Sequence, residues 1–175
     1  MALKLSTIIS QMKRFRDPYG YKDYQVLVGD AVVAPKVGSL YFKSLVNGEG
    51  DTYPNYIQFF DVPFAKHDEK PNEAAKPIPH QKGMLLGRSA KNQYTFPKLN
   101  AGKNRVKVYC KCPDMGFTFS YQLWSRDSFI GAYKKYTRVP GSTRPPRNPL
   151  NVPGFCKHTM AHLRELQKMG YLEGI

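Results

Sequence analysis

The stretch Arg105-Val-Lys-Val-Tyr-Cys-Lys-Cys112 decides the fold of the second half of the chain, because it joins a strand pattern to two metal-binding side chains. Side chains two residues apart on a strand lie on the same face, so the sulfurs of Cys110 and Cys112 are expected to point the same way. The third cysteine opens the triplet Cys156-Lys-His158. Three thiols and one imidazole are a donor set that a closed tetrahedral Zn²⁺ site needs.

The residues beyond this stretch predict the elements that such an ion would join. Pro113-Asp-Met-Gly116 is typical of a turn, and residues 117–124 alternate again, so residues 105–124 are expected to form a β-hairpin. An amphipathic helix is expected over about 156–169. Because 43 residues separate the two groups of cysteines, a bound zinc ion would pin this helix to a distant hairpin.

The same residues allow other interpretations. They could be unrelated buried cysteines, which behave as small apolar side chains, or Cys156 could form a disulfide with Cys110 or Cys112. The thiolates could instead hold an iron–sulfur cluster. His162 follows His158 by four residues, on the same helix face, and is the alternative ligand. Since three cysteines cannot all pair within one chain, thiolates on a metal in a reducing compartment account for all of them best.

The predicted site is structural and not catalytic. Four protein ligands close the coordination shell, whereas a catalytic zinc keeps one position open for water. The sequence has no evident carboxylate pair, Ser/His/Asp set or glycine-rich phosphate loop. The chain is therefore not expected to be an enzyme.

The expected fold class is α+β, with a β-rich N-terminal part over 1–100 and a zinc-binding hairpin, arm and helix over 101–175. The length of 175 residues fits one domain, and the second part is expected to form one compact unit. A short helix is expected from residue 5 to about residue 15. Strand signals follow, and they cover Tyr24–Val28, Ser39–Val46 and Tyr56–Phe60. Residues 61–83, marked by prolines, predict a long loop.

The net charge of +14 favours an acidic partner, which could be nucleic acid, a polyanionic surface or an acidic protein. A basic subunit within a larger neutral assembly would have the same charge. The start of the chain lacks the long apolar segment of a signal peptide, and no apolar run approaches membrane-spanning length. No membrane span is therefore expected.

A basic, proline-rich stretch over 134–149 is the candidate arm for partner or nucleic-acid binding. Its candidate contact residues are Lys134, Lys135, Arg138, Arg144 and Arg147. Tyrosines lie among these cations, so the arm could contact phosphates while its rings stack on bases. The alternative is a solvated tether that packs on an acidic neighbour, because proline-rich sequence is extended and stiff enough to bridge two parts of an assembly.

The order of the four donors also carries a family resemblance. Cys110-x-Cys112 followed by Cys156-x-His158, with a strand before and a helix after, resembles the SWIM-type zinc finger. The resemblance implies zinc ligation by these four residues. That family is associated with binding to nucleic acid or to protein.

Roughly residues 104–170 are also similar to segments of virion structural proteins of large tailed bacteriophages. The similarity lies in Cys-Lys-Cys-Pro-Asp-Met-Gly-Phe-Thr-Phe, residues 110–119, and in Arg-Asn-Pro-Leu-Asn-Val-Pro-Gly-Phe-Cys-Lys-His, residues 147–158. It implies a non-enzymatic structural subunit of the tail, baseplate or neck, which is assembled in the host cytoplasm and contacts other virion proteins. The alternative function is that of a SWIM-like, zinc-dependent nucleic-acid-binding protein.

Overall fold

The computed structural model describes residues 1–20, 22–67, 84–90, 92–133 and 147–175. Its helical segments are α1 (Leu5–Met12), the short 3-10 helix η1 (Pro35–Val37), the π-helix η3 (Met115–Phe119), α2 (Ser120–Trp124) and α3 (Lys157–Lys168). Its strands are β1 (Val26–Val28), β2 (Val32–Ala34), β3 (Ser39–Asn47), β4 (Thr52–Phe59), β5 (Ala65–His67), β6 (Met84–Ser89), β7 (Asn92–Pro97), β8 (Leu99–Asn100), β9 (Val106–Cys110) and β10 (Leu172–Glu173). No helix among the described residues is long and apolar enough to cross a membrane.

An eight-stranded mixed sheet forms the centre of the molecule. The strands follow the order β5-β7-β6-β2-β3-β4-β9, and β1 pairs with β3. β3 and β4 form a long antiparallel hairpin, and β9 continues the sheet antiparallel to β4, so that Phe42, Ile57 and Val108 lie in one row. β8 and β10 form a separate parallel pair. The strand that carries Cys110 therefore belongs to the same sheet as strands from the first sixty residues.

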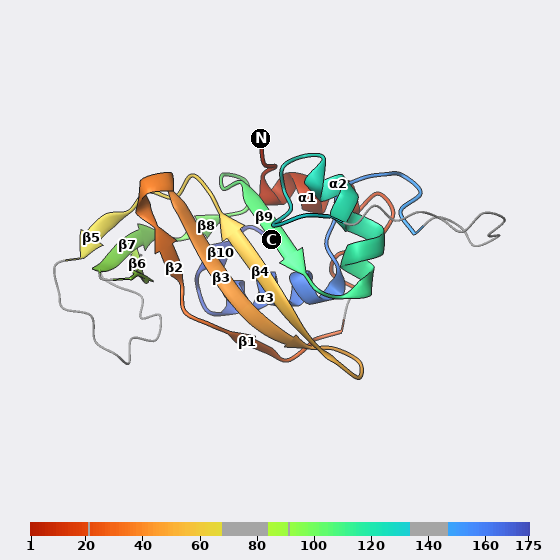
Figure 1. Cartoon of the computed structure of the whole chain (residues 1–175), viewed down its shortest axis with the longest axis horizontal. Coiled ribbons are helices and arrows are strands. Elements are labelled where there is room, and N and C mark those ends of the chain that lie inside the picture. The colour runs from red at the N-terminus through yellow and green to blue at the C-terminus, as the bar shows by residue number, and fades with distance from the viewer. Residues whose placement is uncertain (21, 68–83, 91, 134–146) are drawn as a thin grey trace.

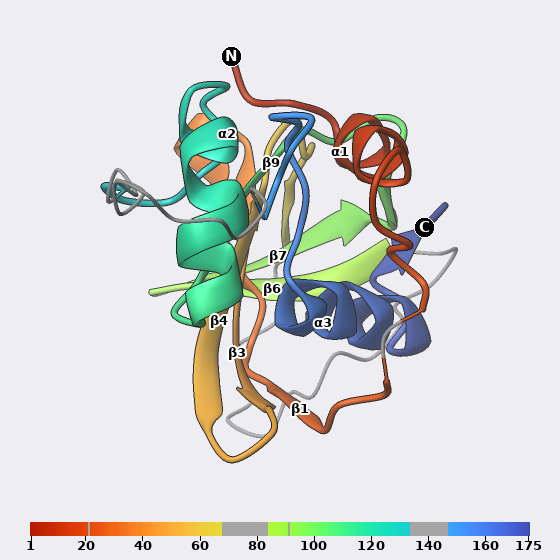
Figure 2. The same ribbon diagram turned by 90° about the vertical axis from the view of Figure 1, so that its right-hand side faces the viewer.

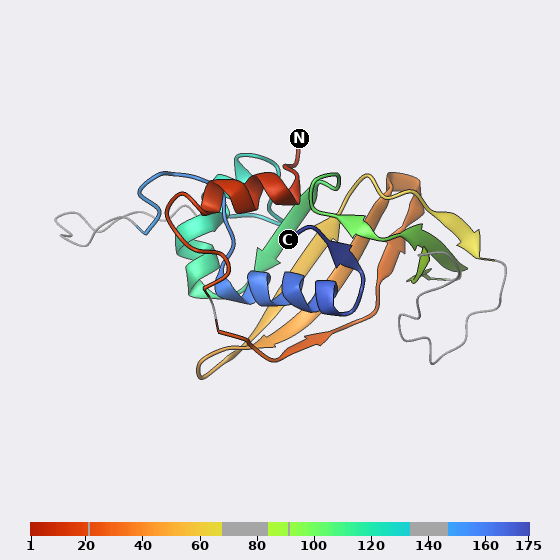
Figure 3. The ribbon, with the colours of Figure 1, turned by 180° about the vertical axis from the view of Figure 1, so that it is seen from behind.

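Both α1 and α3 pack on one face of this sheet, as Figure 3 shows. Alternate residues of β3, β4 and β9 point toward these helices and are buried. The helices contribute apolar stripes to the same core, and these stripes are Leu5, Ile8, Ile9 and Met12 from α1, with Met160, Leu163 and Leu166 from α3. This burial fixes α3 against β1, β3, β4 and β9, which places its first turn beside the end of β9.

Much of the predicted secondary structure is confirmed. The helix that begins at residue 5, the strands over 39–46 and 56–60, and the C-terminal helix are all present, within a mixed α+β fold. The first predicted strand is shorter, because only Val26–Val28 pairs with β3. Of the long loop predicted over 61–83, residues 65–67 form β5 against β7, and residues 68–83 lie outside the described residues.

The prediction of a β-hairpin over residues 105–124 is wrong. The first strand ends at Cys110, and the second predicted strand is instead helical, first as η3 and then as α2. The alternating pattern of residues 117–124 also contains a helical pattern, since Met115, Phe119 and Leu123 recur every fourth residue and are buried together. Burial of this stripe favours the helix over a strand that would have no partner.

Candidate metal centre

The structure brings Cys110, Cys112, Cys156 and His158 together in one buried cluster. The end of β9 and the start of α3, beside which these residues lie, are neighbours in the fold (Figure 1). Their ligand atoms all lie within 4.8 Å of one another, and Cys110 Sγ is 3.9 Å from His158 Nδ1. In a tetrahedral zinc site, bond lengths of about 2.0–2.3 Å place neighbouring ligand atoms about 3.5–3.8 Å apart. The cluster is therefore a candidate zinc site. Its four ligand atoms would need to move slightly closer together to bind the ion.

Two of the sulfurs lie where a helix begins. Cys156 is the N-cap of α3, and its Sγ accepts the backbone N–H of Thr159 at 3.5 Å. Cys112 follows β9 and turns toward the cluster, where its Sγ accepts the backbone N–H of Met115 at 3.3 Å. Free N–H groups at helix starts stabilise negative charge, so both positions favour thiolates.

The three thiols also shift one another's ionisation. The hydrogen bond with Cys112 raises the pKa of Cys110 to about 12, and the same contact, with a second from Cys156, lowers the pKa of Cys112 well below its usual range. Burial and the neighbouring sulfurs raise the pKa of Cys156. The cluster alone thus favours a single thiolate, whereas a divalent cation would allow all three thiols to ionise.

The donor chemistry suits zinc. Thiolates and imidazole are soft or borderline ligands that bind zinc in tetrahedral geometry, and an iron–sulfur cluster draws on the same residue types. The protein's part would be to hold four donors from β9, the following turn and α3. A bound ion would supply a crosslink between these segments.

The imidazole of His158 is held between two tyrosines. Its ring centroid lies 4.5 Å from that of Tyr53 and 5.4 Å from that of Tyr24. Nδ1 faces Cys110, and Nε2 is buried without a hydrogen-bond partner among the described residues. A Cβ atom at Gly48 would lie 2.7 Å from this Nε2, so the tip of the β3–β4 hairpin must be glycine there. Nothing in the sequence pattern pointed to this contact.

His162, the alternative ligand, lies outside the four-residue cluster. It is connected to Cys156 through Asn55 and Thr159. Its Nδ1 is 2.8 Å from Asn55 Oδ1, and Asn55 Nδ2 donates to Thr159 Oγ1 at 2.8 Å. Thr159 Oγ1 is in turn 3.3 Å from Cys156 Sγ. Burial lowers the pKa of His162 to about 3, so the ring is neutral. A buried chain of hydrogen bonds therefore links β4 to one of the candidate ligands.

Of the five candidate contact residues of the arm, only Arg147 lies among the described residues. Lys134, Lys135, Arg138 and Arg144 lie outside the described residues. Arg147 is exposed, and its guanidinium carbon lies 5.9 Å from the ring centroid of Phe117. The guanidinium of Arg147 thus lies over the aromatic ring of a residue in η3.

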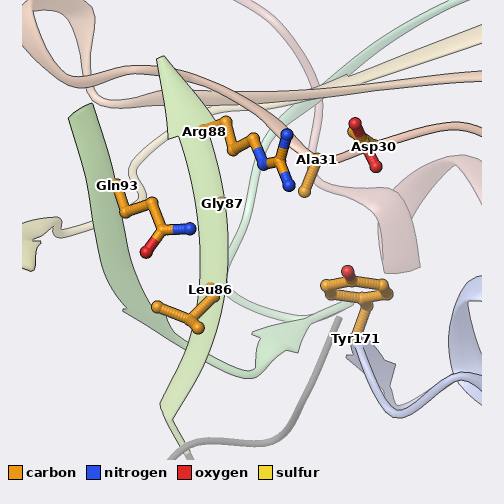
Figure 4. Close-up of a pocket in the computed structure, with 7 residues that line it drawn as sticks. All are labelled: Asp30, Ala31, Leu86, Gly87, Arg88, Gln93 and Tyr171. Atoms are coloured by element: carbon orange, nitrogen blue, oxygen red, sulfur yellow. The ribbon is translucent and has the colours of Figure 1, made fainter. Parts of the chain in front are cut away.

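A small hollow lies beside β6 and β7, and none of the residues that line it belongs to the metal cluster. Figure 4 shows the Arg88 guanidinium and the Tyr171 hydroxyl extending toward Ala31 and Asp30, beside β6. Burial, and to a lesser extent Asp30, raise the pKa of Tyr171. The hollow has room for about one water molecule, so it is too small for a substrate. Among the described residues, no second group of three or more His, Cys, Asp or Glu side chains has a metal-binding arrangement.

Comparison of the chain with known protein families, with curated proteins and with solved structures found no match.

Proposed function

We propose that this chain is a non-enzymatic structural subunit of a large assembly, in which a zinc ion stabilises the fold and an aromatic surface docks on a neighbouring protein. Four protein ligands would leave the ion no open position for water, which supports a structural role over a catalytic one. The three thiols and one imidazole also favour zinc over cations that prefer oxygen ligands, such as Mg²⁺ or Ca²⁺.

The docking surface is an aromatic patch, which consists of Phe117, Tyr121, Trp124 and Tyr133. The first three recur at helical spacing along η3 and α2, and their exposed fractions are 49%, 49% and 47%. The Tyr133 ring packs 4.4 Å from the Trp124 ring, measured between centroids. Large aromatic side chains are enriched in protein interfaces, and contiguous exposed apolar patches mark interaction sites. The patch therefore supports a role in assembly.

The observation that carries the proposal is the attachment of η3, which presents part of this patch, to the candidate ligand Cys112. Cys112 is a candidate ligand, and its sulfur also accepts the N–H that begins η3. The backbone oxygen of Cys112 accepts a second bond, from the N–H of Gly116 at 3.2 Å. A zinc ion that fixes Cys112 would thereby fix the helix that presents the aromatic rings.

The proposed setting is a tailed phage particle, in its tail, baseplate or neck, after assembly in the host cytoplasm. The support for this setting is the resemblance of residues 104–170 to virion structural proteins. The mixed α+β fold and the buried donor set are compatible with it.

Mass spectrometry of purified particles from a phage that encodes this chain tests the proposal. The protein is expected in the particles, and Trp124→Ala is expected to reduce its incorporation. Tyr19→Ala is the matched control, because Tyr19 is also an exposed aromatic residue but lies outside the patch. Absence of the chain from particles, or equal incorporation of both variants, would contradict the proposal.

A second candidate is a SWIM-like, zinc-dependent nucleic-acid-binding protein, and the net charge of +14 favours it. In that case the basic arm would contact phosphates. Binding of duplex DNA that disappears with a chelator and weakens steeply with salt would support this candidate over docking to a protein.

A further inference from the structure

One face of the central sheet is open over β2, β3 and β4, where the described part of the chain places no helix. α1 and α3 cover the opposite face, whereas the described helices on this side, η3 and α2, lie beside β9 at the edge of the sheet and leave β2, β3 and β4 uncovered (Figures 1 and 2). Directly paired residues of neighbouring strands point to the same face, so the registers assign the side chains of this open face. Its central members are Tyr41, Lys43, Tyr56, Gln58, Lys107 and Tyr109.

Three tyrosines form a row on the open face, which runs from β3 across β4 to the edge strand β9. The ring centroid of Tyr56 lies 5.8 Å from that of Tyr41 and 5.7 Å from that of Tyr109. All three side chains are partly exposed, so the row is a surface and not part of the core. The apolar side chains of Val32 and Leu45, which are 49% and 40% exposed, flank the row on the same face.

The strands that form this face carry positive side chains and no negative ones. Strands β1, β2, β3, β4 and β9 contain no aspartate or glutamate, whereas they contain Lys43 and Lys107. The ammonium of Lys43 lies 5.8 Å from the Tyr56 ring centroid. Lys107 pairs with Asp127, which follows α2. Lys43 thus places a cation directly beside the central ring.

We infer that the open face binds a single strand of nucleic acid, with bases stacked on the tyrosine row and a phosphate at Lys43. Aromatic rings on an exposed sheet stack unpaired bases, typically two or three of them, and neighbouring cations track the backbone. A duplex hides the faces of its bases, so it cannot use the row in this way. The inference goes beyond the assembly role, and it depends neither on zinc nor on the basic arm.

Fluorescence anisotropy with end-labelled dT and rU oligonucleotides of about 12 nucleotides tests the inference. The wild-type chain is expected to bind a single strand more tightly than a duplex of equal length. Tyr56→Ala removes the central ring and is expected to weaken binding by about 5- to 150-fold, the range measured for loss of one stacked base. Tyr56→Phe keeps the ring and is expected to restore binding to near the wild-type value.

Tyr19→Ala is the matched control for loss of a tyrosine, because Tyr19 contacts α3 through its backbone, on the covered side of the sheet. For charge, Lys43→Gln is expected to reduce the slope of log K against log salt by about 0.7, the value of one phosphate contact on a single strand. Lys36→Gln, an exposed lysine in η1, is the control and should leave the slope unchanged.

Several outcomes would overturn the inference. These are no binding of either oligonucleotide, duplex binding as tight as single-strand binding, or equal affinities for Tyr56→Ala and Tyr19→Ala. Quenching of Trp124, the only tryptophan in the chain, would place the strand on the aromatic patch instead. Zinc content and particle incorporation are separate measurements, so failure of this inference leaves the proposed assembly role standing, and the reverse also holds.

Discussion

Replacing Cys112 by serine removes one of the four candidate ligands with little change in size. The variant is expected to lose the ion, and with it the crosslink between β9 and α3. Cys112 and Cys156, which the ion would connect, are separated by 43 residues. A crosslink that closes a loop of this length restricts the unfolded chain and contributes about 4 kcal/mol at 25 °C. A chain of this size loses about 2–4 °C of melting temperature per kcal/mol, so Tm is expected to fall by about 8–16 °C.

Thermal unfolding followed by circular dichroism measures this loss. A chelator added to the wild-type chain is expected to lower Tm by a similar amount, whereas the Cys112→Ser variant should no longer respond to the chelator. The chelator preloaded with zinc, which cannot remove a zinc ion from the protein, controls for ionic effects. A variant with the wild-type Tm, or a wild-type chain indifferent to chelation, would show that no metal crosslink exists.

Three further changes test the surroundings of the site. Gly48→Ala is expected to weaken zinc binding by about 10-fold or more in a competitive chelator titration, because its Cβ would lie 2.7 Å from His158 Nε2; Gly116→Ala, whose Cβ meets no atom within 4 Å, should bind zinc normally. Asn55→Ala leaves buried His162 Nδ1 without its partner, at a cost of about 1–3 kcal/mol in urea unfolding, while Thr159 Oγ1 keeps Cys156 Sγ; an unchanged midpoint would show that this chain of hydrogen bonds does not stabilise the fold. His162 has its pKa lowered to about 3, so the folded state binds fewer protons than the unfolded state, and stability falls by up to about 1.4 kcal/mol per pH unit as pH drops from about 6.5 toward 3. His162→Gln should flatten this part of the pH profile, and an unchanged slope would assign the acid sensitivity to other groups.

The sequence predicted the donor set because its residue types are rare and chemically specific. Cysteine occurs only three times, and all three positions fall in the cluster. Periodicity was equally sufficient for α1, β3 and α3, where one pattern dominates. It failed for residues 117–124, which satisfy both the strand and the helix pattern, and there tertiary burial of Phe119 and Leu123 selects the helix.

The remaining features depend on contacts between distant residues. His162 meets Asn55 across 107 positions of sequence, and Gly48 approaches His158 only because α3 packs beside the β3–β4 hairpin. The tyrosine row likewise exists only once the strand registers are known. Such pairings leave no local pattern, so composition and spacing could not predict them.

The metal content of the purified chain tests the central claim most directly. Protein prepared without chelators should contain about one zinc ion per chain by elemental mass spectrometry, since four buried donors converge on one point. Iron in place of zinc would indicate a cluster and change the assignment. A folded chain with no bound metal would contradict the claim, because the cysteines would then be ordinary core residues.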